Sequence, residues 1–465
     1  MKDTFDVLIV GMGPAGLAAA AKLGESGLNF AIIDAGKAVD DRDRYSPDDS
    51  TQGHGGAGLF SDGKFSFFPS ASDLWSLPRG TDLRAAYDWT CSVLQAAGLD
   101  TPPFPDNPNA YSPGHAPGTE EWVLKAYPSD YLSLDARLAL VRSMVESCRG
   151  TIYSERKVLD LAHDAALDRF TVQTQHSLTN EVSYLTAKRL VLASGRFGPL
   201  ERCLRGLTAH YAFRRLEVGF RIQQRSDRAF FRDMRQLDPK LRIREPGGGV
   251  EWRTFCVCRQ GETCLTQTGG LWTVSGRSDC PPTGWSNSGF NTRVFDEGLA
   301  ERAWPPLEKA LRSAGAHFEV SAAAVLRGDA GAVAALDRIY GPELRVKMAE
   351  GLRWLSLAFE DLGMDEDAKL IGPTLEGIGW YPQVDGDLRL LDAPAWVAGD
   401  TCGLFRGIVA AMISGHYAAA SVMNNTRHVP PSSKCETCSE DYLCKACIRL
   451  ARGGQPKVSG FACRS

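Results

Sequence analysis

The chain lacks several features, and each absence excludes a class of function. It has no run of about 18 or more apolar residues, so the sequence predicts no membrane-spanning helix. Its 52 basic and 56 acidic residues leave a net charge of −4, which gives no global positive field for nucleic acid or an anionic membrane. Internal repeats and long low-complexity segments are absent as well. The apolar N-terminus lacks the charge pattern of a secretory signal peptide, so a cytoplasmic location is expected.

Cysteine, in contrast, is abundant. Thirteen cysteines are many for a cytosolic protein, and they are not spaced like a disulfide framework. Several cluster at Cys256 and Cys258 and again within 435–447, which indicates metal binding or redox chemistry. A length of 465 residues, with 43% hydrophobic and 23% charged residues, is typical of a soluble globular protein of two or three domains.

A strand, a glycine-rich turn and a helix are predicted in succession near the N-terminus. Residues 7–10 form a short apolar, β-branched run, as in a buried parallel strand, and the alanine-rich stretch 17–26 suits a helix. Gly11, Gly13 and Gly16 stand between them. The first permits a tight turn, the second lets a pyrophosphate approach the backbone, and the third lets helix and strand pack closely.

An acidic residue follows this turn at the distance expected for a dinucleotide site. A second strand, 29–33, ends at Asp34, whose carboxylate is expected to accept hydrogen bonds from a ribose hydroxyl. The phosphates would lie at the positive end of the helix, facing its free N–H groups. Because strand, turn, helix and acid occur in this order, the context favours a bound dinucleotide over a glycine-rich turn without a ligand.

Glycine is concentrated a second time in the segment 51–65. The sequence there reads TQGHGGAGLFSDGKF, which is poor material for a helix or a strand. Such a segment either lets the backbone approach a flat, bulky group or forms a loop without a ligand. Its composition alone leaves both readings open.

The remaining pattern mixes helices and strands. The strands predicted between 157 and 186 have the spacing of an antiparallel meander, and the stretch 200–298 is β-rich. Helices are predicted at 83–97, 135–148, 305–314, 333–339, 342–362 and 407–423, and strands at 157–162, 169–175, 182–186, 189–192, 216–222, 254–257 and 395–400.

Three elements of this pattern occur in a characteristic order. They are the glycine turn with its later acid, an apolar strand that ends in Ala193-Ser194-Gly195, and a strand that ends in Gly399-Asp400 before a helix. This order resembles the FAD-binding architecture of the glutathione reductase superfamily. There the acid of the Gly-Asp pair holds the ribitol or pyrophosphate side of FAD, and the next helix points its N-terminus at the flavin N1–O2 edge. The resemblance implies these roles for Asp400 and for the turn 403–408.

Shorter motifs narrow the resemblance. They are 55–58 (GGAG) with 60–64 (FSDGK), 193–196 (ASGR), 217–221 (EVGFR) and 253–258 (RTFCVC). They are similar to motifs of the largely uncharacterised FAD-dependent dehydrogenase family and spread over residues 1–425. The turn 399–407 departs from that family's usual Gly-Glu-Gly-Ala-Gly, which leaves the placement of Cys402 and Arg406 near the ring open.

The resemblance implies an α/β fold, with a Rossmann-like FAD-binding domain of the glutathione reductase type and an inserted β-rich substrate domain. The Cys-rich C-terminal tail lies outside the pattern of the family and completes the expected organisation. The expected boundaries are 1–200 for the N-terminal part of the FAD-binding domain, 201–350 for the substrate or cap domain, 351–426 for the return into the FAD-binding domain, and 427–465 for the tail. The implied FAD-binding residues are Gly11, Gly13, Pro14, Ala15, Gly16, Asp34, Gly56, Ala57, Ser61, Gly195, Asp400, Gly407 and Ile408.

Two cations are candidates for catalysis. Arg406 precedes the predicted helix and could stabilise the negative charge at N1–O2 that develops when the flavin takes hydride at N5. The alternative is an arginine that faces solvent or a phosphate. Lys64 lies in the glycine-rich segment and could contact the N5 side or the substrate, or could cap a carbonyl as a structural lysine.

Other side chains have competing readings. His54 precedes the double glycine and is a weak candidate for covalent attachment of FAD. Arg196 and Arg221 end predicted strands and could pair a substrate carboxylate, although salt bridges within the fold are favoured. Cys256 and Cys258 would lie on one face of a strand, either as an electron-shuttling thiol pair or as packing residues, and packing is slightly favoured.

Four cysteines of the tail have the spacing of a metal site. Cys435-x-x-Cys438 and Cys444-x-x-Cys447 offer four thiolates, which predicts a closed, structural Zn site. The alternatives are an iron–sulfur cluster and free or reversibly oxidised thiols. The surrounding segment has too few apolar residues to fold alone, so a metal would supply the missing folding energy.

Only one dinucleotide fingerprint is present, because the middle of the chain has no second GxGxxG. NAD(P)H would therefore bind transiently, or electrons would come from a substrate or a protein partner. The leading hypothesis is an FAD-dependent oxidoreductase, a dehydrogenase or reductase that transfers hydride between flavin and a small-molecule substrate. The alternatives are a flavin monooxygenase and a flavin-carrying binding protein whose zinc tail docks a partner or RNA, although nucleic acid is not an expected main partner.

Overall fold

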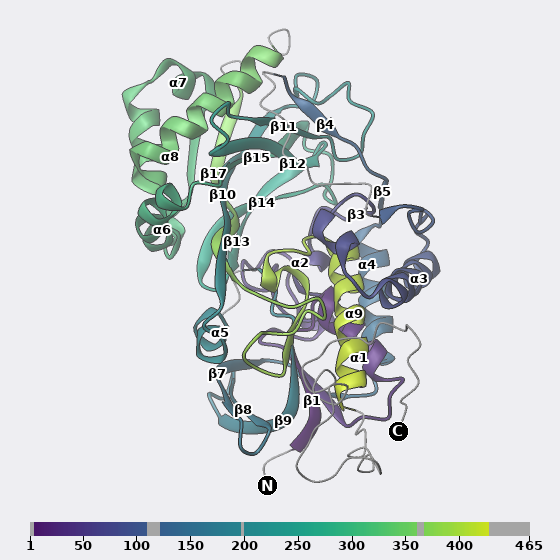
Figure 1. Ribbon diagram of the computed structural model, residues 1–465. Helices are drawn as coiled ribbons and strands as arrows, with labels where there is room; N and C mark the ends of the chain where they lie inside the picture. The colour runs from purple at the N-terminus through teal and green to yellow at the C-terminus, as the bar shows by residue number, and fades with distance from the viewer. Residues whose placement is uncertain (1–3, 109–120, 197–199, 360–366, 427–465) are drawn as a thin grey trace, which may run out of the picture. The chain divides into compact units, whose positions relative to one another are not determined.

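The computed structural model describes residues 4–108, 121–196, 200–359 and 367–426. The chain has a mixed α/β fold, and residues 1–423 form one compact unit. Within this unit two hydrophobic cores are built on two large sheets, which lie one above the other in Figure 1. In the described part of the chain, no helix is both long and apolar enough to cross a membrane.

The first sheet has the strand order β6-β2-β1-β9-β8-β7, with β18 beside β9. Strands β6, β2, β1, β9 and β18 run parallel, whereas β8 and β7 complete the sheet as an antiparallel meander. The predicted strands 182–186 and 189–192 are one continuous strand, β9. The bounds are β1 Thr4–Val10, β2 Phe30–Ile33, β6 Thr151–Tyr153, β7 Arg156–Asp164, β8 Arg169–His176, β9 Val182–Leu192 and β18 Ala395–Val397.

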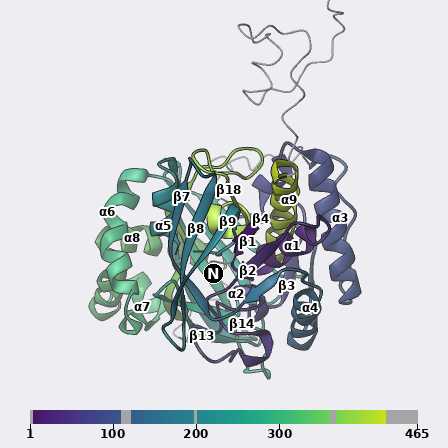
Figure 2. The same ribbon diagram turned by 90° about the horizontal axis from the view of Figure 1, so that it is seen from below.

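Helices cover the parallel part of this sheet, and Figure 2 shows α1, α3, α4 and α9 together on one side of it. Small residues allow α9 to pack closely on α1, since a Cβ at Gly415 would lie 1.9 Å from the carbonyl oxygen of Ala15. The beginnings of the two helices are thereby held next to each other. The bounds are α1 Pro14–Leu23, α3 Gly80–Ala96, α4 Leu134–Glu146, α5 Glu201–Leu207 and α9 Ile408–Thr426.

The second sheet is antiparallel, with the order β16-β17-β10-β15-β12-β11-β4. Helices α6, α7 and α8 gather along one side of it (Figure 1). The predicted helices 333–339 and 342–362 are the single element α8, kinked at Gly341. The bounds are β4 Val123–Lys125, β10 Tyr211–Arg225, β11 Lys240–Arg244, β12 Val250–Cys258, β15 Trp285–Val294, β16 Phe318–Ser321, β17 Lys369–Pro382, α6 Glu297–Leu311, α7 Ala322–Arg327 and α8 Ala330–Ala358.

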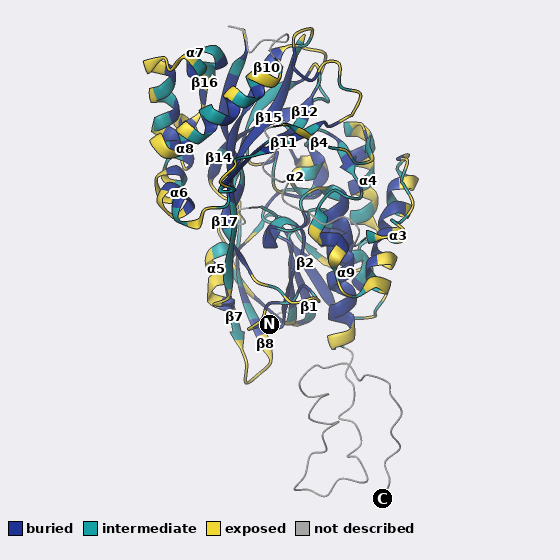
Figure 3. Ribbon diagram, turned by 45° about the horizontal axis from the view of Figure 1, so that its top comes forward, coloured by how far each residue is buried: buried dark blue, intermediate teal, exposed yellow. Residues whose placement is uncertain are grey.

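The two faces of the second sheet differ sharply in chemistry. Along β10, Leu216, Val218 and Phe220 alternate toward the core shared with α6 and α8. The residues between them include Glu217 and Arg221, which are just as buried. Figure 3 shows β10, β12 and β15 largely in dark blue, whereas exposed residues are seen on the helices and in the loops. Within the segment expected in the FAD-binding part, residues 352–355 and 368–381 contribute apolar side chains to this second core.

Two short sheets and a short helix complete the fold. Strands β3 Lys64–Ser66 and β5 Ser129–Tyr131 pair with each other, as do β13 Glu262–Thr268 and β14 Leu271–Arg277. The glycine-rich segment contains the helix α2 Gly56–Leu59, which its composition did not predict. Four small or apolar residues form this single turn because Gly55, at φ +83°, reverses the chain before it.

Candidate functional site

The turn between β1 and α1 leaves a helix N-terminus without side-chain partners. Gly13 is the N-cap of α1, no side chain accepts a hydrogen bond there, and the first turn contains no acidic residue. The first N–H groups of a helix have no partner within the helix and attract anions. This turn therefore offers the donors and the dipole that a pyrophosphate requires.

The three glycines of the turn have different physical roles. Gly11 has φ +104°, and a Cβ on it would lie 2.3 Å from the carbonyl oxygen of Ala193. A Cβ on Gly16 would lie 1.8 Å from the carbonyl oxygen of Gly11. At Gly13 the nearest atom to a Cβ would be the Cα of Gly56, at 3.9 Å. Packing thus explains Gly11 and Gly16, whereas Gly13 keeps a surface open.

Asp34 connects the turn to the glycine-rich segment. One carboxylate oxygen accepts from the N–H of Met12 at 2.7 Å, and the other accepts from the N–H groups of Gly36 and Gly53 at 2.8 and 2.9 Å. A carboxylate has about four lone-pair sites, so capacity for a further donor remains. Its contact with a ribose hydroxyl stays a prediction.

Arg42 is a buried organiser of the same region that the sequence analysis missed. Its guanidinium donates to the carbonyl oxygens of Asp49 at 2.9 Å and Gly56 at 3.0 Å, and also to that of His54. Burial lowers the pKa of Arg42 to about 10. The available signal was weak, because Arg42 is one of two arginines in the polar stretch between the two glycine-rich segments. His54 contacts Ser154 through Nε2 at 2.8 Å, and burial lowers the pKa of His54.

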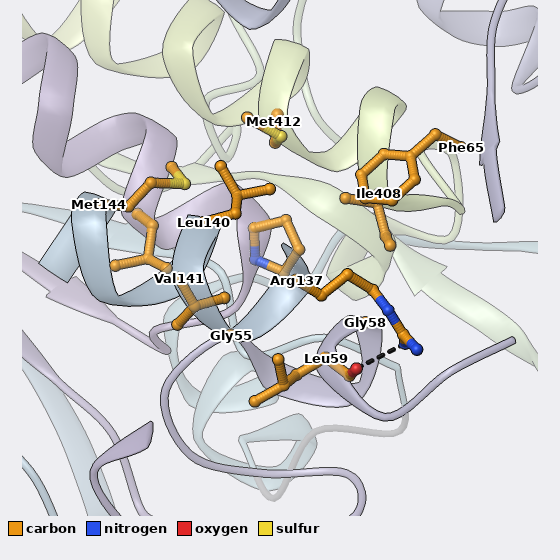
Figure 4. Close-up of a pocket in the computed structure, with 12 residues that line it drawn as sticks. Gly55, Gly58, Leu59, Phe65, Arg137, Leu140, Val141, Met144, Ile408 and Met412 are labelled. Atoms are coloured by element: carbon orange, nitrogen blue, oxygen red, sulfur yellow. Dashed lines mark hydrogen bonds between the residues drawn. The ribbon is translucent and has the colours of Figure 1, made fainter. Parts of the chain in front are cut away.

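A side chain of α4 holds the glycine-rich segment in place through hydrogen bonds to its backbone. Arg137 donates to the carbonyl oxygens of Leu59 at 2.6 Å and Ser61 at 2.9 Å, and pairs with Asp279 at 2.6 Å. In Figure 4 it reaches from α4 toward Leu59 beside an apolar cavity. That cavity has a volume of ≈ 30 Å³, which holds about one water molecule but no flavin ring. Its walls are Pro14, Leu17, Gly55, Gly58, Leu59, Phe65, Arg137, Leu140, Val141, Met144, Ile408 and Met412.

The Gly-Asp turn brings the third expected segment to the same place. A Cβ on Gly58 would lie 3.1 Å from Cγ1 of Ile408, the first residue of α9, and Gly56 adjoins Gly13. The turn at Gly13, the segment around 56–58 and the start of α9 therefore meet. Gly195 is joined to the Gly-Asp turn by its N–H, which donates to Thr401 Oγ1 at 3.1 Å.

Asp400 has one oxygen engaged and one without a donor. Oδ2 accepts from Arg406 Nε at 3.0 Å and lies 3.3 Å from Arg196 Nε. Oδ1 is buried and has no hydrogen-bond partner among the described residues. A buried carboxylate oxygen without a donor costs about 1–3 kcal/mol, so this position favours a hydroxyl-bearing ligand.

The two candidate catalytic cations are bound by carboxylates. Arg406 contacts Asp400, Glu217 and Glu376, the last two at 3.2 and 3.4 Å. Lys64 contacts Asp62 at 3.1 Å and also donates to the carbonyl oxygen of Val257. Burial opposes its charge, but nearby carboxylates raise the pKa of Lys64. The carbonyl contact is the kind expected of Lys64 as a structural lysine, whereas the three carboxylates around Arg406 correspond to neither of the roles considered for it.

The face of the second sheet opposite the core shared with α6 and α8 carries a buried network of charged side chains. Glu217 on β10 forms ion pairs with Arg253 and Arg293, each at 3.3 Å, and also with Arg406 and Arg215. The arginines hold the pKa of Glu217 well below its usual range despite its burial. Arg196 pairs with Glu376 at 2.6 Å, and Arg221 donates to Asn287 at 2.8 Å, so both make contacts within the fold.

Unpartnered polar groups lie next to this network. Asn291 on β15 is fully buried, and neither atom of its side-chain amide has a partner among the described residues. Thr374 Oγ1 and Arg253 Nε are buried without hydrogen-bond partners among the described residues of the same sheet. Register places Asn291 opposite both Arg253 and Gly219, on the face that contacts Arg406. Buried polar groups of this kind are normally satisfied by water or a ligand.

The four tail cysteines, Cys435, Cys438, Cys444 and Cys447, lie outside the described residues. Their predicted metal site therefore stays a prediction.

The solved structures that this chain resembles cover most of its length, but at low sequence identity and low TM-score. No protein-family model and no curated protein matches the sequence. Among solved structures, a flavoprotein/dehydrogenase from Cytophaga hutchinsonii is 13% identical, with a TM-score of 0.39 over 90% of this chain and 78% of that one. A geranylgeranyl bacteriochlorophyll reductase-like protein from Thermoplasma acidophilum is 13% identical, with a TM-score of 0.40 over 91% and 79%. A p-nitrophenol 4-monooxygenase from Pseudomonas putida is 14% identical, with a TM-score of 0.36 over 92% and 81%. At these values the likeness carries no conclusion about this chain.

Proposed function

We propose that this chain is an FAD-dependent oxidoreductase that transfers hydride between a bound flavin and a small polar molecule. FAD would lie along the turn at Gly13, the segment 55–64 and the turn 403–408, which meet in the fold. When bound, FAD supplies a carrier of two electrons that accepts hydride at N5. The chain's own residues bind and orient it.

The observation that carries the proposal is the unpartnered Oδ1 of Asp400. It is buried beside the start of α9, while its companion oxygen is fixed by Arg406 and Arg196. A ribitol hydroxyl would donate to it and remove the cost of an unsatisfied acceptor. The uncapped N-terminus of α1 and the open surface at Gly13 provide the matching place for the pyrophosphate.

The N-terminus of α9 is proposed to face the N1–O2 edge of the ring. Gly407, at φ +107°, turns the chain into this helix, whose first turn contains no acidic residue. The positive end of its dipole would stabilise negative charge on the reduced ring. Arg406 is compensated by three carboxylates and so acts as a positioning residue in this arrangement. The cavity of ≈ 30 Å³ below 55–59 is too small for the ring, which must lie on the outer side of that segment.

The substrate is proposed to lie against the charged face of the second sheet. Burial lowers the pKa of Lys125 to about 7, and the neighbouring cations Lys240, Arg253, Arg242 and Arg293 add to this effect. This group of cations, together with the unpartnered amide of Asn291, supports the proposal of a substrate with an anionic group. A screen compares how fast small carboxylates or phosphates and their neutral amides or alcohols change the redox state of the flavin. If the anionic compounds are no faster than the neutral ones, this placement is contradicted.

Asp400→Ala tests the cofactor assignment, and Glu376→Ala is its matched control. Both variants remove a carboxylate from Arg196 and Arg406, but only the first removes the unpartnered oxygen. We expect the dissociation constant of FAD to rise about tenfold or more in Asp400→Ala, because a hydrogen bond to a charged group contributes about 1.5–3 kcal/mol. Glu376→Ala should change it less than about threefold. FAD fluorescence quenching measures both, and equal losses in the two variants would contradict the assignment.

The reaction of the reduced flavin with O₂ distinguishes the monooxygenase alternative from hydride transfer. If the reduced flavin reoxidises rapidly in O₂ and the substrate is hydroxylated, the chain is a monooxygenase. Reoxidation without a hydroxylated product supports the hydride-transfer proposal.

A further inference from the structure

Cys256 and Cys258 lie at a bulge of β12, next to the glycine-rich segment. Phe255 pairs with Gly289 and Cys258 pairs with Asn287, so two residues of β12 stand opposite one residue of β15. Cys256 takes φ +48°, a left-handed conformation that non-glycine residues rarely adopt. Such strain persists where the surrounding structure enforces it and is concentrated at functional sites.

At the bulge the two sulfur atoms lie close to each other and to a carboxylate. The Sγ atoms of Cys256 and Cys258 and a carboxylate oxygen of Asp62 all lie within 4.8 Å of one another. The Cys256 thiol donates to Asp62 Oδ2 at 3.0 Å, and Cys258 is fully buried. Because Asp62 belongs to the segment 55–64, the sulfur pair adjoins the segment that is proposed to line the flavin.

The surrounding charges favour a thiolate over a metal ion. Arg221 Nη2 lies 3.5 Å from Cys258 Sγ, and Lys64 Nζ lies 3.1 Å from the same carboxylate oxygen of Asp62. A hydrogen bond from Cys256, with the charges of Arg221 and Lys64, lowers the pKa of Cys258. Two fixed cations beside the three candidate ligand atoms oppose a further cation but match a thiolate paired with a thiol.

We propose that Cys256 and Cys258 form a reversible dithiol–disulfide couple that exchanges two electrons with the flavin. The S–S bond forms as the Cys256 S–H bond breaks, and the pair gives up two electrons and one proton. Oxidised FAD, when bound, would supply the acceptor for both electrons and the proton, and the reverse step would restore thiol and thiolate. This inference rests on the proposed function. It gives the chain a second electron store, in keeping with a sequence that contains one dinucleotide fingerprint.

The oxidation state of the pair can be read directly from one peptide. Trypsin cleaves after Arg253 and Arg259, which releases TFCVCR with both cysteines. The full-length protein is equilibrated anaerobically in glutathione buffers of graded oxidation, quenched with acid, unfolded and alkylated. We expect the peptide to pass from a doubly alkylated form to an unalkylated form that is about 2 Da lighter than the dithiol, as a disulfide requires. A peptide that stays doubly alkylated in every buffer overturns the proposal.

An electron count tests the link to the flavin. Protein preoxidised in glutathione disulfide and freed of it is titrated anaerobically with dithionite, and wild type should take up about two electrons per chain more than Cys258→Ser. Cys148→Ser is the control, because Cys148 is a half-buried thiol that packs against the first hydrophobic core, with its Sγ 4.0 Å from the carbonyl oxygen of Gly150. It should match wild type. Equal electron counts in wild type and Cys258→Ser overturn the flavin link.

The outcomes separate this inference from the proposed function. Yellow protein with a permanently reduced peptide keeps the FAD assignment and rejects the couple. Colourless protein whose peptide still oxidises rejects the FAD assignment and with it the exchange of electrons. Alkylation that is blocked until a chelator removes zinc, with that zinc absent from Cys258→Ser, replaces the couple by a metal site.

Discussion

At the scale of single residues, the glycines of the first turn separate packing from ligand binding. Gly16 cannot carry a side chain because a Cβ would lie 1.8 Å from the carbonyl oxygen of Gly11. Gly13 has room, since the nearest atom to a Cβ would be 3.9 Å away. The motif GxGxxG therefore contains one glycine that the fold does not need, and the proposed pyrophosphate explains it.

We therefore expect opposite results from two alanine substitutions. Gly13→Ala should keep its melting temperature within about 2 °C, because the nearest atom to the Cβ would be the Cα of Gly56 at an ordinary contact distance of 3.9 Å, but should lose most of its FAD. Gly16→Ala should lower the melting temperature by about 5 °C or more, because strand and helix must separate. Thermal denaturation and bound-flavin absorbance measure the two properties. Wild-type FAD content in Gly13→Ala would contradict the role given to this residue.

At the scale of elements, the second sheet shows what sequence patterns can and cannot predict. Alternation along 216–222 predicted a strand, and β10 confirms it. Contacts within the fold were favoured for Arg221, but Glu217 was not singled out, because its alternation with apolar residues is that of a solvent-facing residue. Their partners come from distant segments, such as Arg406 and Asn287. Local periodicity therefore located the elements, while the pairing that buries the charges depended on tertiary structure.

The same limit applies to the first half of the chain. The strand–turn–helix at the N-terminus, the meander and the helix after Gly407 were all predicted from local pattern, and their positions agree with β1, α1, β7–β9 and α9. The helix α2 was missed because glycine-rich composition argued against it. Arg42 was missed because its partners are backbone carbonyls, which leave no mark on the sequence. Arg137 was missed because it binds two backbone carbonyls and Asp279, which is distant in sequence.

The charged face predicts how stability depends on pH. The arginines hold the folded-state pKa of Glu217 below its unfolded value, so its contribution is present above about pH 4.5 and is lost as the pH falls through the folded pKa. Glu217→Gln should lower the free energy of unfolding by about 3–5 kcal/mol at pH 7, because it leaves buried arginines uncompensated. The difference from wild type should shrink below pH 4.5.

Glu319→Gln serves as the control for this change. Glu319 pairs with Lys369 at the same sheet, but both side chains are more than two-fifths exposed, at 47% and 41%. Its effect should stay within about 0.5 kcal/mol at every pH. Urea unfolding at several pH values measures both variants, and a Glu217→Gln deficit that does not diminish in acid would refute the linkage.

At the scale of the whole molecule, the two hydrophobic cores belong to one compact unit that ends at Met423. All residues given to the flavin and to the dithiol couple lie in this unit. A chain of residues 1–426 should therefore retain FAD with the affinity of the full-length protein. Loss of FAD on this truncation would show that the tail contributes to cofactor binding.

The tail carries an independent prediction. Full-length protein should contain about one Zn per chain, and Cys435→Ser/Cys438→Ser should lose it while keeping FAD. Elemental analysis checks this. Brown protein with iron and sulfide would indicate an iron–sulfur cluster, and absence of metal with four alkylatable tail thiols would reject both readings.

The central claim is that this fold carries FAD, and the flavin content of the purified chain tests it most directly. The absorbance spectrum, with the flavin released by heat and identified by mass, should give about one FAD per chain, either as purified or after incubation with FAD. A folded protein that neither contains FAD nor takes it up would contradict the account, because the open surface at Gly13 and the unpartnered oxygen of Asp400 would then need another ligand.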